Sequence, residues 1–321
     1  MYVGVQGIGT SRKELEFLTR HGVTHMDTSI DPDDLDQMVK QREEAAAMGV
    51  ELEMIHIPLA ESIPLALDPQ RDRDIDAICG WIENAGRAGL RGLNYNFSTV
   101  GYQRTEMRYG RGGSAYSSFE FSKYDNDEPH KGGQVSRDEM YARAAYFLER
   151  VIPVAEENKV QMASHLPDPP APVLRGEERW NYPVFEGLKR FSELVDSSYH
   201  GFNFCCGTAA EGLDDPGKEL PEIVEYFSSH KKIFNVHFRN IRGGLNDFVE
   251  VWPDEGDVNM YTLAKIFHKT GYPYMLMPDH SPLHPDDVPP PGTSGRVRQG
   301  GAFQFGYIIA MIQAMEMEAS A

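Results

Sequence analysis

The sequence is poor in cysteine and in long apolar runs, and each shortage excludes a class of protein. Three residues in 321 are cysteine: Cys79, Cys205 and Cys206. An odd, sparse set with a vicinal pair does not form a disulfide framework, so we expect free thiols and a cytoplasmic location. No apolar stretch approaches the roughly 20 residues that cross a bilayer, and the first residues carry no signal segment. We therefore expect no membrane partner.

Basic residues are also scarce. Lysine and arginine number 31 against 49 aspartates and glutamates, a formal net charge of −18. Phosphate neutralisation needs clustered basic side chains, so we expect no nucleic-acid partner, although a local basic pocket could still bind a small anion. Hydrophobic residues make up 40% and charged residues 25% of the chain. This composition and length predict one large folded unit over residues 1–321.

Strand-like and helix-like patterns alternate along the chain, which predicts an α/β protein with a parallel sheet. The expected strands cover 2–7, 23–28, 51–57, 90–97, 161–165, 201–206, 233–239 and 274–278. The expected helices begin near Ser11, Asp33, Asp72, Ser136, Val184, Pro221, Asn259 and Ala302. A single (β/α)8 TIM barrel is the economical interpretation. A doubly wound sheet stays open, because periodicity cannot show whether the sheet closes.

A long loop after the fourth expected strand interrupts this alternation. Residues 98–134 are rich in glycine, tyrosine, serine, arginine and aspartate and show neither helical nor strand periodicity. Loops of this length in compact domains are usually functional, so we favour a lid over a site, with Arg104 available to clamp an acid. The alternatives are a structural excursion or a contact in a homo-oligomer.

Four successive expected strands end in residue types that bind metals: His165, Cys205-Cys206, His237 and Asp279-His280. Taken singly, each could be an ordinary structural residue. In a (β/α)8 barrel, however, the C-terminal ends of all strands meet at one face, where active sites lie. The pattern therefore predicts a metal site with nitrogen, oxygen and sulfur donors, which suits zinc, manganese, iron or cobalt. Alternation along the strand leaves open which cysteine faces inward.

Other polar residues at strand ends could bind a substrate. Arg239 and Asn240 come just after His237 and suit carboxylates and hydroxyls, or else act as scaffolding. Tyr95 and Asn96 end the fourth strand and should face the same site. His56 ends the third strand, where a structural role is as good an interpretation.

Several short segments occur together in a recognisable order. They are Glu61-Ser62-Ile63-Pro64, Arg71-Asp72-Arg73, Tyr95-Asn96-Phe97, Arg104-Thr105, His165 with Asp168-Pro169-Pro170, Cys205 with Gly207, His237-Phe238-Arg239-Asn240, Gly256-Asp257-Val258-Asn259-Met260-Tyr261 and Pro278-Asp279-His280. With them the chain resembles the mannonate dehydratases of hexuronate catabolism, metal-dependent enzymes with a xylose-isomerase-like TIM barrel.

The resemblance implies roles for particular residues. It selects Cys205 over Cys206 and implies a divalent ion, usually manganese, although Fe²⁺ or another divalent metal would suit the same donors. The implied ligands are His165, Cys205, His237 and Asp279. It also implies that His280 transfers a proton. The family's second catalytic group lies in a C-terminal Gly-Tyr segment; here Tyr307 is the counterpart, displaced along the chain from the family pattern. The first strand also departs from the family, because it lacks an aromatic, arginine-rich opening.

The implied activity is that of a carbon–oxygen lyase, which removes water from a sugar acid and converts D-mannonate to 2-keto-3-deoxy-D-gluconate. The small-molecule substrate would meet the metal at the strand ends. One alternative is a metal-dependent sugar isomerase or epimerase of the same barrel superfamily, which would return the abstracted proton and expel no hydroxyl. A second is a sugar-acid-binding or structural barrel with a decayed site.

Overall fold

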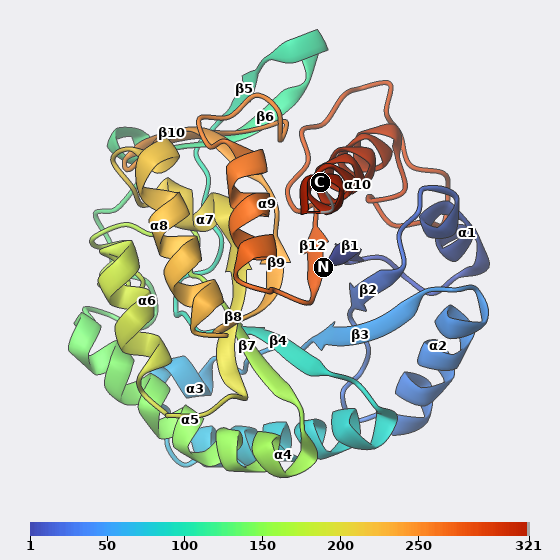
Figure 1. The fold of residues 1–321 in the computed structure, drawn as a ribbon. Coiled ribbons are helices and arrows are strands. Elements are labelled where there is room, and N and C mark those ends of the chain that lie inside the picture. The colour runs from blue at the N-terminus through green and yellow to red at the C-terminus, as the bar shows by residue number, and fades with distance from the viewer. Residues whose placement is uncertain (320–321) are drawn as a thin grey trace.

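The computed structural model describes residues 1–319 and contains a closed barrel of parallel strands (Figure 1). Around the barrel the strand order is β1-β12-β9-β8-β7-β4-β3-β2. Their bounds are β1 Tyr2–Gln6, β2 His25–Thr28, β3 Glu51–His56, β4 Gly92–Asn96, β7 Gln161–His165, β8 His200–Cys205, β9 Ile233–His237 and β12 Met275–Met277. The first and last barrel strands pair directly, Tyr2 with Met275. This closure confirms the TIM barrel and excludes the doubly wound sheet.

Helices surround the strands on the outside, as Figure 1 shows. They are α1 Arg12–Arg20, α2 Leu35–Ala47, α3 Ser62–Leu65, α4 Gln70–Ala88, α5 Arg137–Asn158, α6 Val184–Ser192, α7 Cys206–Glu211, α8 Pro216–Ser229, α9 Met260–Lys269 and α10 Gln299–Ala319. The sequence patterns did not predict α3 and α7, because four to six residues are too few to show helical periodicity. None of the helices in residues 1–319 combines the length and the apolar character that a membrane span requires.

Local capping explains where several helices begin and end. The Ser136 hydroxyl accepts a hydrogen bond from the backbone N–H of Glu139 at 3.2 Å, so it caps α5. Gly89 ends α4 with φ +75°, a conformation that glycine adopts without a steric penalty. Ser11 stands at the start of α1 but caps no backbone N–H with its side chain, because its hydroxyl donates to the Glu14 carboxylate at 2.6 Å.

A second, antiparallel sheet lies beyond the C-terminal ends of the barrel strands. It contains β5 Met107–Tyr109, β6 Ala115–Glu120, β10 Asn240–Gly244 and β11 Asp247–Val251, in the order β10-β11-β6-β5. The expectation that residues 98–134 lack strands was therefore wrong. The strands are short, and their packing partners are distant in sequence: Phe119 on β6 stacks on Phe248 of β11 with ring centroids 5.8 Å apart. The β5–β6 hairpin projects from the body of the molecule in Figure 1.

A small apolar layer fills part of the barrel interior. Met54, Ala163 and Phe234 are almost fully buried and form a cluster separate from the main core. They come from β3, β7 and β9, which are alternate strands of the barrel, as in other barrels of this type. Ala163 precedes His165 by two residues, so both side chains point inward. The site at the strand ends therefore rests on a packed floor.

Candidate metal centre and active site

Strand register brings the four expected ligands to one place. Cys205 is directly opposite His237 in the β8–β9 pair, and His237 is opposite Met277 in the β9–β12 pair. Asp279 comes two residues after Met277, and His165 ends β7, the other neighbour of β8. The side chains therefore converge because adjacent parallel strands end at the same level.

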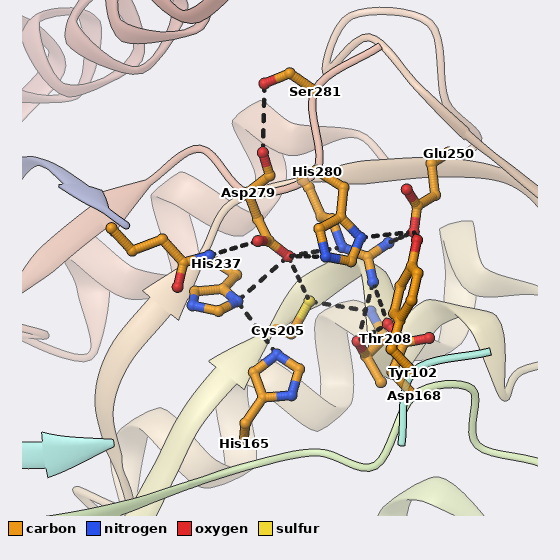
Figure 2. Close-up of polar contacts among 12 residues, drawn as sticks. Tyr102, His165, Asp168, Cys205, Thr208, His237, Glu250, Asp279, His280 and Ser281 are labelled. Carbon is orange, nitrogen blue, oxygen red and sulfur yellow. Dashed lines mark hydrogen bonds and ion pairs between the residues drawn. The ribbon is translucent and has the colours of Figure 1, made fainter. Parts of the chain in front are cut away.

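The donor atoms of His165, Cys205, His237 and Asp279 all lie within 4.8 Å of one another. Nε2 of His165 is 3.2 Å from Nδ1 of His237, and Nδ1 of His237 is 3.4 Å from Oδ2 of Asp279 (Figure 2). The Cys205 sulfur is 3.8 Å from the same carboxylate oxygen. Ligands bound at about 2.0–2.3 Å around one tetrahedral ion are roughly 3–4 Å apart. The spacing and the donor chemistry fit a first-row divalent metal.

Hydrogen bonds outside the cluster orient both histidines. Nδ1 of His165 lies 2.7 Å from the carbonyl oxygen of Leu166, which fixes the proton on Nδ1 and leaves the lone pair of Nε2 facing the other ligands. The side-chain nitrogen of Asn203 lies 3.0 Å from Nε2 of His237, and the buried oxygen of the same amide has no partner in the described residues, so the opposite orientation of the amide satisfies both groups. With that oxygen turned to Nε2–H, Nδ1 of His237 is free to bind a metal.

Asn203→Ala should therefore weaken divalent metal binding about 10–100-fold, the usual effect of removing a group that holds a ligand histidine. Competition with a metal chelator measures the affinity. Asn235→Ala is the matched control, because Asn235 pairs with Asn203 in the neighbouring strand, while its side-chain oxygen accepts from the backbone N–H of Val236 and not from the cluster. Equal affinities for the wild type and Asn203→Ala would contradict this role.

The two cysteines differ in their surroundings, which resolves the choice between them. Cys205 caps α7, and its sulfur accepts the backbone N–H of Thr208 at 3.3 Å. Burial alone would raise the pKa of Cys205, but the Arg239 charge and a hydrogen bond from His237 outweigh it and lower that pKa. Burial raises the pKa of Cys206 well above its usual range. Cys205 is thus the thiol prepared to bind as a thiolate.

Arg239 lies in a buried ion-pair cluster behind the ligands, where its side chain is 2% exposed. Its Nε donates to Asp279 at 3.1 Å and its Nη1 to Glu211 at 2.8 Å. Its Nη2 donates to Asp168 at 2.9 Å. Every nitrogen of the guanidinium group is therefore committed to a protein carboxylate.

Arg104 enters the same cluster from the loop after β4. Its Nε donates to Glu250 at 3.1 Å, its Nη1 to Asp168, and its Nη2 to Glu211 at 3.1 Å. Burial raises the pKa of Glu211 well above its usual range, which limits the number of ionised carboxylates around the two arginines. Removing one partner of such a buried pair costs roughly 3–5 kcal/mol. Arg104 and Arg239 hold the loop and Asp279 in place. The sequence suggested that these arginines bind a substrate carboxylate, but in this geometry their donors are already taken by protein carboxylates.

His280 stands between this cluster and the ligands. Its Nδ1 is 2.8 Å from Oε1 of Glu250, and its Nε2 is 3.7 Å from Oδ2 of Asp279 (Figure 2). The Tyr102 ring packs edge-on against the imidazole with centroids 4.9 Å apart. Burial alone would lower the pKa of His280, but the Asp279 and Glu250 carboxylates outweigh it and the pKa is raised. Glu250 thus orients the ring so that Nε2 faces the ligand cluster.

A cavity of about 380 Å³ opens beside these groups, a volume suited to a small metabolite. Among the expected residues it is lined by Asn96, His165, His237, Asp279 and His280. The loop after β4 contributes Ser98, Val100, Gly101 and Tyr102 to the same cavity. The first part of the loop therefore covers the site, whereas Tyr109 on the hairpin is 77% exposed.

Three expected site residues lie elsewhere. Tyr95 is fully buried and packs edge-on against Phe147 of α5, since consecutive residues of a strand face opposite sides and Asn96 takes the inward position. The Asn240 amide donates to the carbonyl oxygens of Pro253 and Val258, so it organises a loop.

Tyr307 lies on α10, one turn after Phe303, and is not among the residues that line the cavity. Burial and the Asp254 charge raise the pKa of its phenol, and Asp254 lies outside the candidate site. The displacement of this tyrosine along the chain thus removes it from the site, and the structure gives it no catalytic position.

Other cavity residues were missed by the sequence patterns. Asp27 lies one residue before the end of β2, a polar residue near a strand end, so a signal was present; burial raises its pKa to about 7. Tyr102 and Arg296 also line the cavity but gave no local signal, because these loop residues reach it only through tertiary contacts. Glu250 of β11 does not line the cavity and joins the site through His280. His56, for which both roles were open, lines the cavity, and burial lowers its pKa to about 4.

Comparison with known proteins places this site in context. A mannonate dehydratase of Thermotoga petrophila is 28% identical over 325 residues, which cover 88% of this chain and 86% of the relative. The crystal structure of mannonate dehydratase from Streptococcus suis serotype 2 superposes with a TM-score of 0.88 at 25% identity, over all of this chain and 95% of that one. An L-ribulose 3-epimerase structure, 14% identical with a TM-score of 0.61 over all of this chain and 97% of that one, shares the fold alone.

The family comparison covers the part of the chain that carries the expected ligands. The model of the D-mannonate dehydratase (UxuA) family matches residues 131–319, more than half of the chain, and this range includes all four expected ligands and His280. The family performs a hydro-lyase reaction on a sugar acid, which favours the dehydratase over the isomerase or epimerase. The chain belongs to the D-mannonate dehydratase family.

Proposed function

We propose that this protein removes water from D-mannonate and yields 2-keto-3-deoxy-D-gluconate. In this reaction a proton leaves C2, the hydroxyl leaves C3 as water, and the resulting enol becomes the ketone. The observation that carries the proposal is a cluster of four metal-donor atoms beside the imidazole of His280, with three of the four donor residues and His280 lining one cavity.

The donor cluster and the family together support a divalent metal ion, and manganese is the ion we propose. His165, Cys205, His237 and Asp279 would hold it. When bound, such an ion acts as a Lewis acid on substrate oxygens next to the carbon that loses its proton. The carboxylate and the thiolate would balance its two positive charges, so the bound centre would carry no net charge.

His280 is the group we propose for proton transfer to the departing hydroxyl. Its Nδ1 is engaged with Glu250, so Nε2 is the nitrogen that can give or take a proton in the cavity. Tyr102 covers the ring from the loop side, and burial raises the pKa of its phenol, which keeps the hydroxyl protonated. A neutral phenol here can donate a hydrogen bond but cannot act as the base.

The test is a panel of aldonic acids incubated with manganese-loaded protein, scored for 2-keto-3-deoxy acid. We expect D-mannonate to give product and protein stripped of metal by a chelator to give none. Solvent deuterium appearing in the recovered substrate without any keto-deoxy acid, across the panel, would instead support an isomerase or epimerase.

A further inference from the structure

The cavity has an unusual balance of charge for a site that takes an acid. Its lining contains three carboxylates, Asp27, Asp168 and Asp279. The same lining contains a single arginine and no lysine in the described part of the chain, and that arginine is Arg296. Arg104 and Arg239 lie behind the lining, with all their nitrogens committed to protein acceptors.

Arg296 keeps unused hydrogen-bonding capacity. Its Nη1 donates to the backbone oxygen of Asp279, and its Nη2 lies 3.5 Å from Oδ1 of the same residue. Within residues 1–319 it has no other acceptor, so three of the roughly five N–H groups of a guanidinium remain free. The side chain is 22% exposed, at the wall of the cavity.

The backbone around Arg296 is fixed by contacts to the start of the chain. The N–H of Ser294 donates to the buried Glu14 carboxylate at 2.9 Å, and its hydroxyl donates to the Gly7 carbonyl oxygen at 2.7 Å. The N–H of Arg296 in turn donates to the Ser294 hydroxyl at 3.2 Å. These hydrogen bonds fix the loop that carries Arg296 and so hold its guanidinium group at the cavity.

We infer that Arg296 binds the carboxylate of the acid substrate, a role that rests on the proposed dehydration of a sugar acid. A guanidinium group matches a carboxylate with two parallel hydrogen bonds, which a lysine cannot reproduce. Its anchoring to Asp279 sets the acid end of the substrate next to the metal ligands. Arg296 is then the residue that selects an acid over a neutral polyol.

The experiment compares Arg296→Met and Arg296→Lys with the wild type in two measurements. In the first, D-mannonate turnover separates KM from kcat. We expect Arg296→Met to raise KM about 10–100-fold, the range for losing a hydrogen bond to a charged group, with a much smaller change in kcat and unchanged metal content. The KM of Arg296→Lys should fall between the values of the wild type and Arg296→Met. Arg298→Met is the matched control, because Arg298 binds the Ser281 carbonyl oxygen in the same loop but does not line the cavity.

The second measurement needs no turnover. Calorimetric titration compares D-mannonate with D-mannitol, its uncharged polyol counterpart, using metal-loaded protein under conditions of slow or absent reaction. We expect the wild type to prefer the acid and Arg296→Met to lose that preference. A variant that keeps the preference but loses kcat or metal would assign Arg296 to positioning Asp279 and overturn the inference. If the wild type prefers the acid yet makes no keto-deoxy product, the proposed function fails while the preference still decides the role of Arg296. No preference in the wild type overturns the inference directly.

Discussion

His280→Asn should lower turnover with D-mannonate by about 10²–10⁴-fold, the usual contribution of one positioned acid or base. The asparagine amide can still donate to Glu250, so the ion-pair cluster keeps its geometry. An asparagine amide does not titrate near neutral pH and cannot act as an acid or base there, whereas an imidazole can. Product formation under saturating substrate measures the loss, and metal analysis confirms that the variant keeps its ion.

His284→Asn is the matched control for this prediction. His284 lies four residues farther along the same loop, where its Nε2 contacts the Gly112 carbonyl oxygen, and it is absent from the lining of the cavity. We expect its turnover to stay near that of the wild type. Turnover by His280→Asn close to the wild type, with metal and fold intact, would remove His280 from the mechanism.

His237→Ala should lose divalent metal and, with it, the dehydration reaction. The Nδ1 of His237 is central to the cluster, 3.2 Å from the His165 nitrogen and 3.4 Å from the Asp279 oxygen. Deleting a ligand should weaken affinity by more than the roughly 10–100-fold expected for a supporting residue such as Asn203. Metal analysis after dialysis measures occupancy.

Thermal unfolding gives a second readout for the same variant. A metal that binds only the folded state stabilises it by mass action, so added manganese should raise the Tm of the wild type but not that of His237→Ala. His25→Ala is the control: His25 begins β2 and stacks on Tyr2 of the neighbouring strand, with centroids 3.6 Å apart. A His237→Ala protein that binds manganese like the wild type would show that the cluster is not the metal site.

The donor residues at the strand ends meet in the structure because local pattern and tertiary position here depend on the same physics. A buried parallel strand is mostly apolar, and its exposed polar groups lie where it leaves the barrel. His165, Cys205 and His237 each occupy that last strand position, so their place in the chain already implied their place in space. The choice of Cys205 over Cys206 depended on the direction of one side chain, which the residues alone left open.

The substrate-binding predictions depended on contacts that no local pattern contains. Arg239 follows a ligand in sequence, but its donors are taken by Asp168 and Glu211, carboxylates from other strand ends and helices. Arg104 meets Glu250 across 146 positions of sequence. Whether an arginine is free to bind a ligand is a question of which carboxylates the fold brings to it.

The sequence by itself determined the alternation of strands and helices and the metal-donor residue types at the strand ends, because periodicity and strand-end polarity follow from burial along the local chain. Closure of the sheet into a barrel was decided by the tertiary structure, in which β1 pairs with β12. Only the tertiary structure decided that β5, β6, β10 and β11 form a second sheet, that Tyr95 faces outward, that Tyr307 stands apart from the cavity and that Arg296 lines it. These outcomes depend on the packing and hydrogen bonding of segments far apart in the chain, and the free energy of such contacts is not set by any one segment.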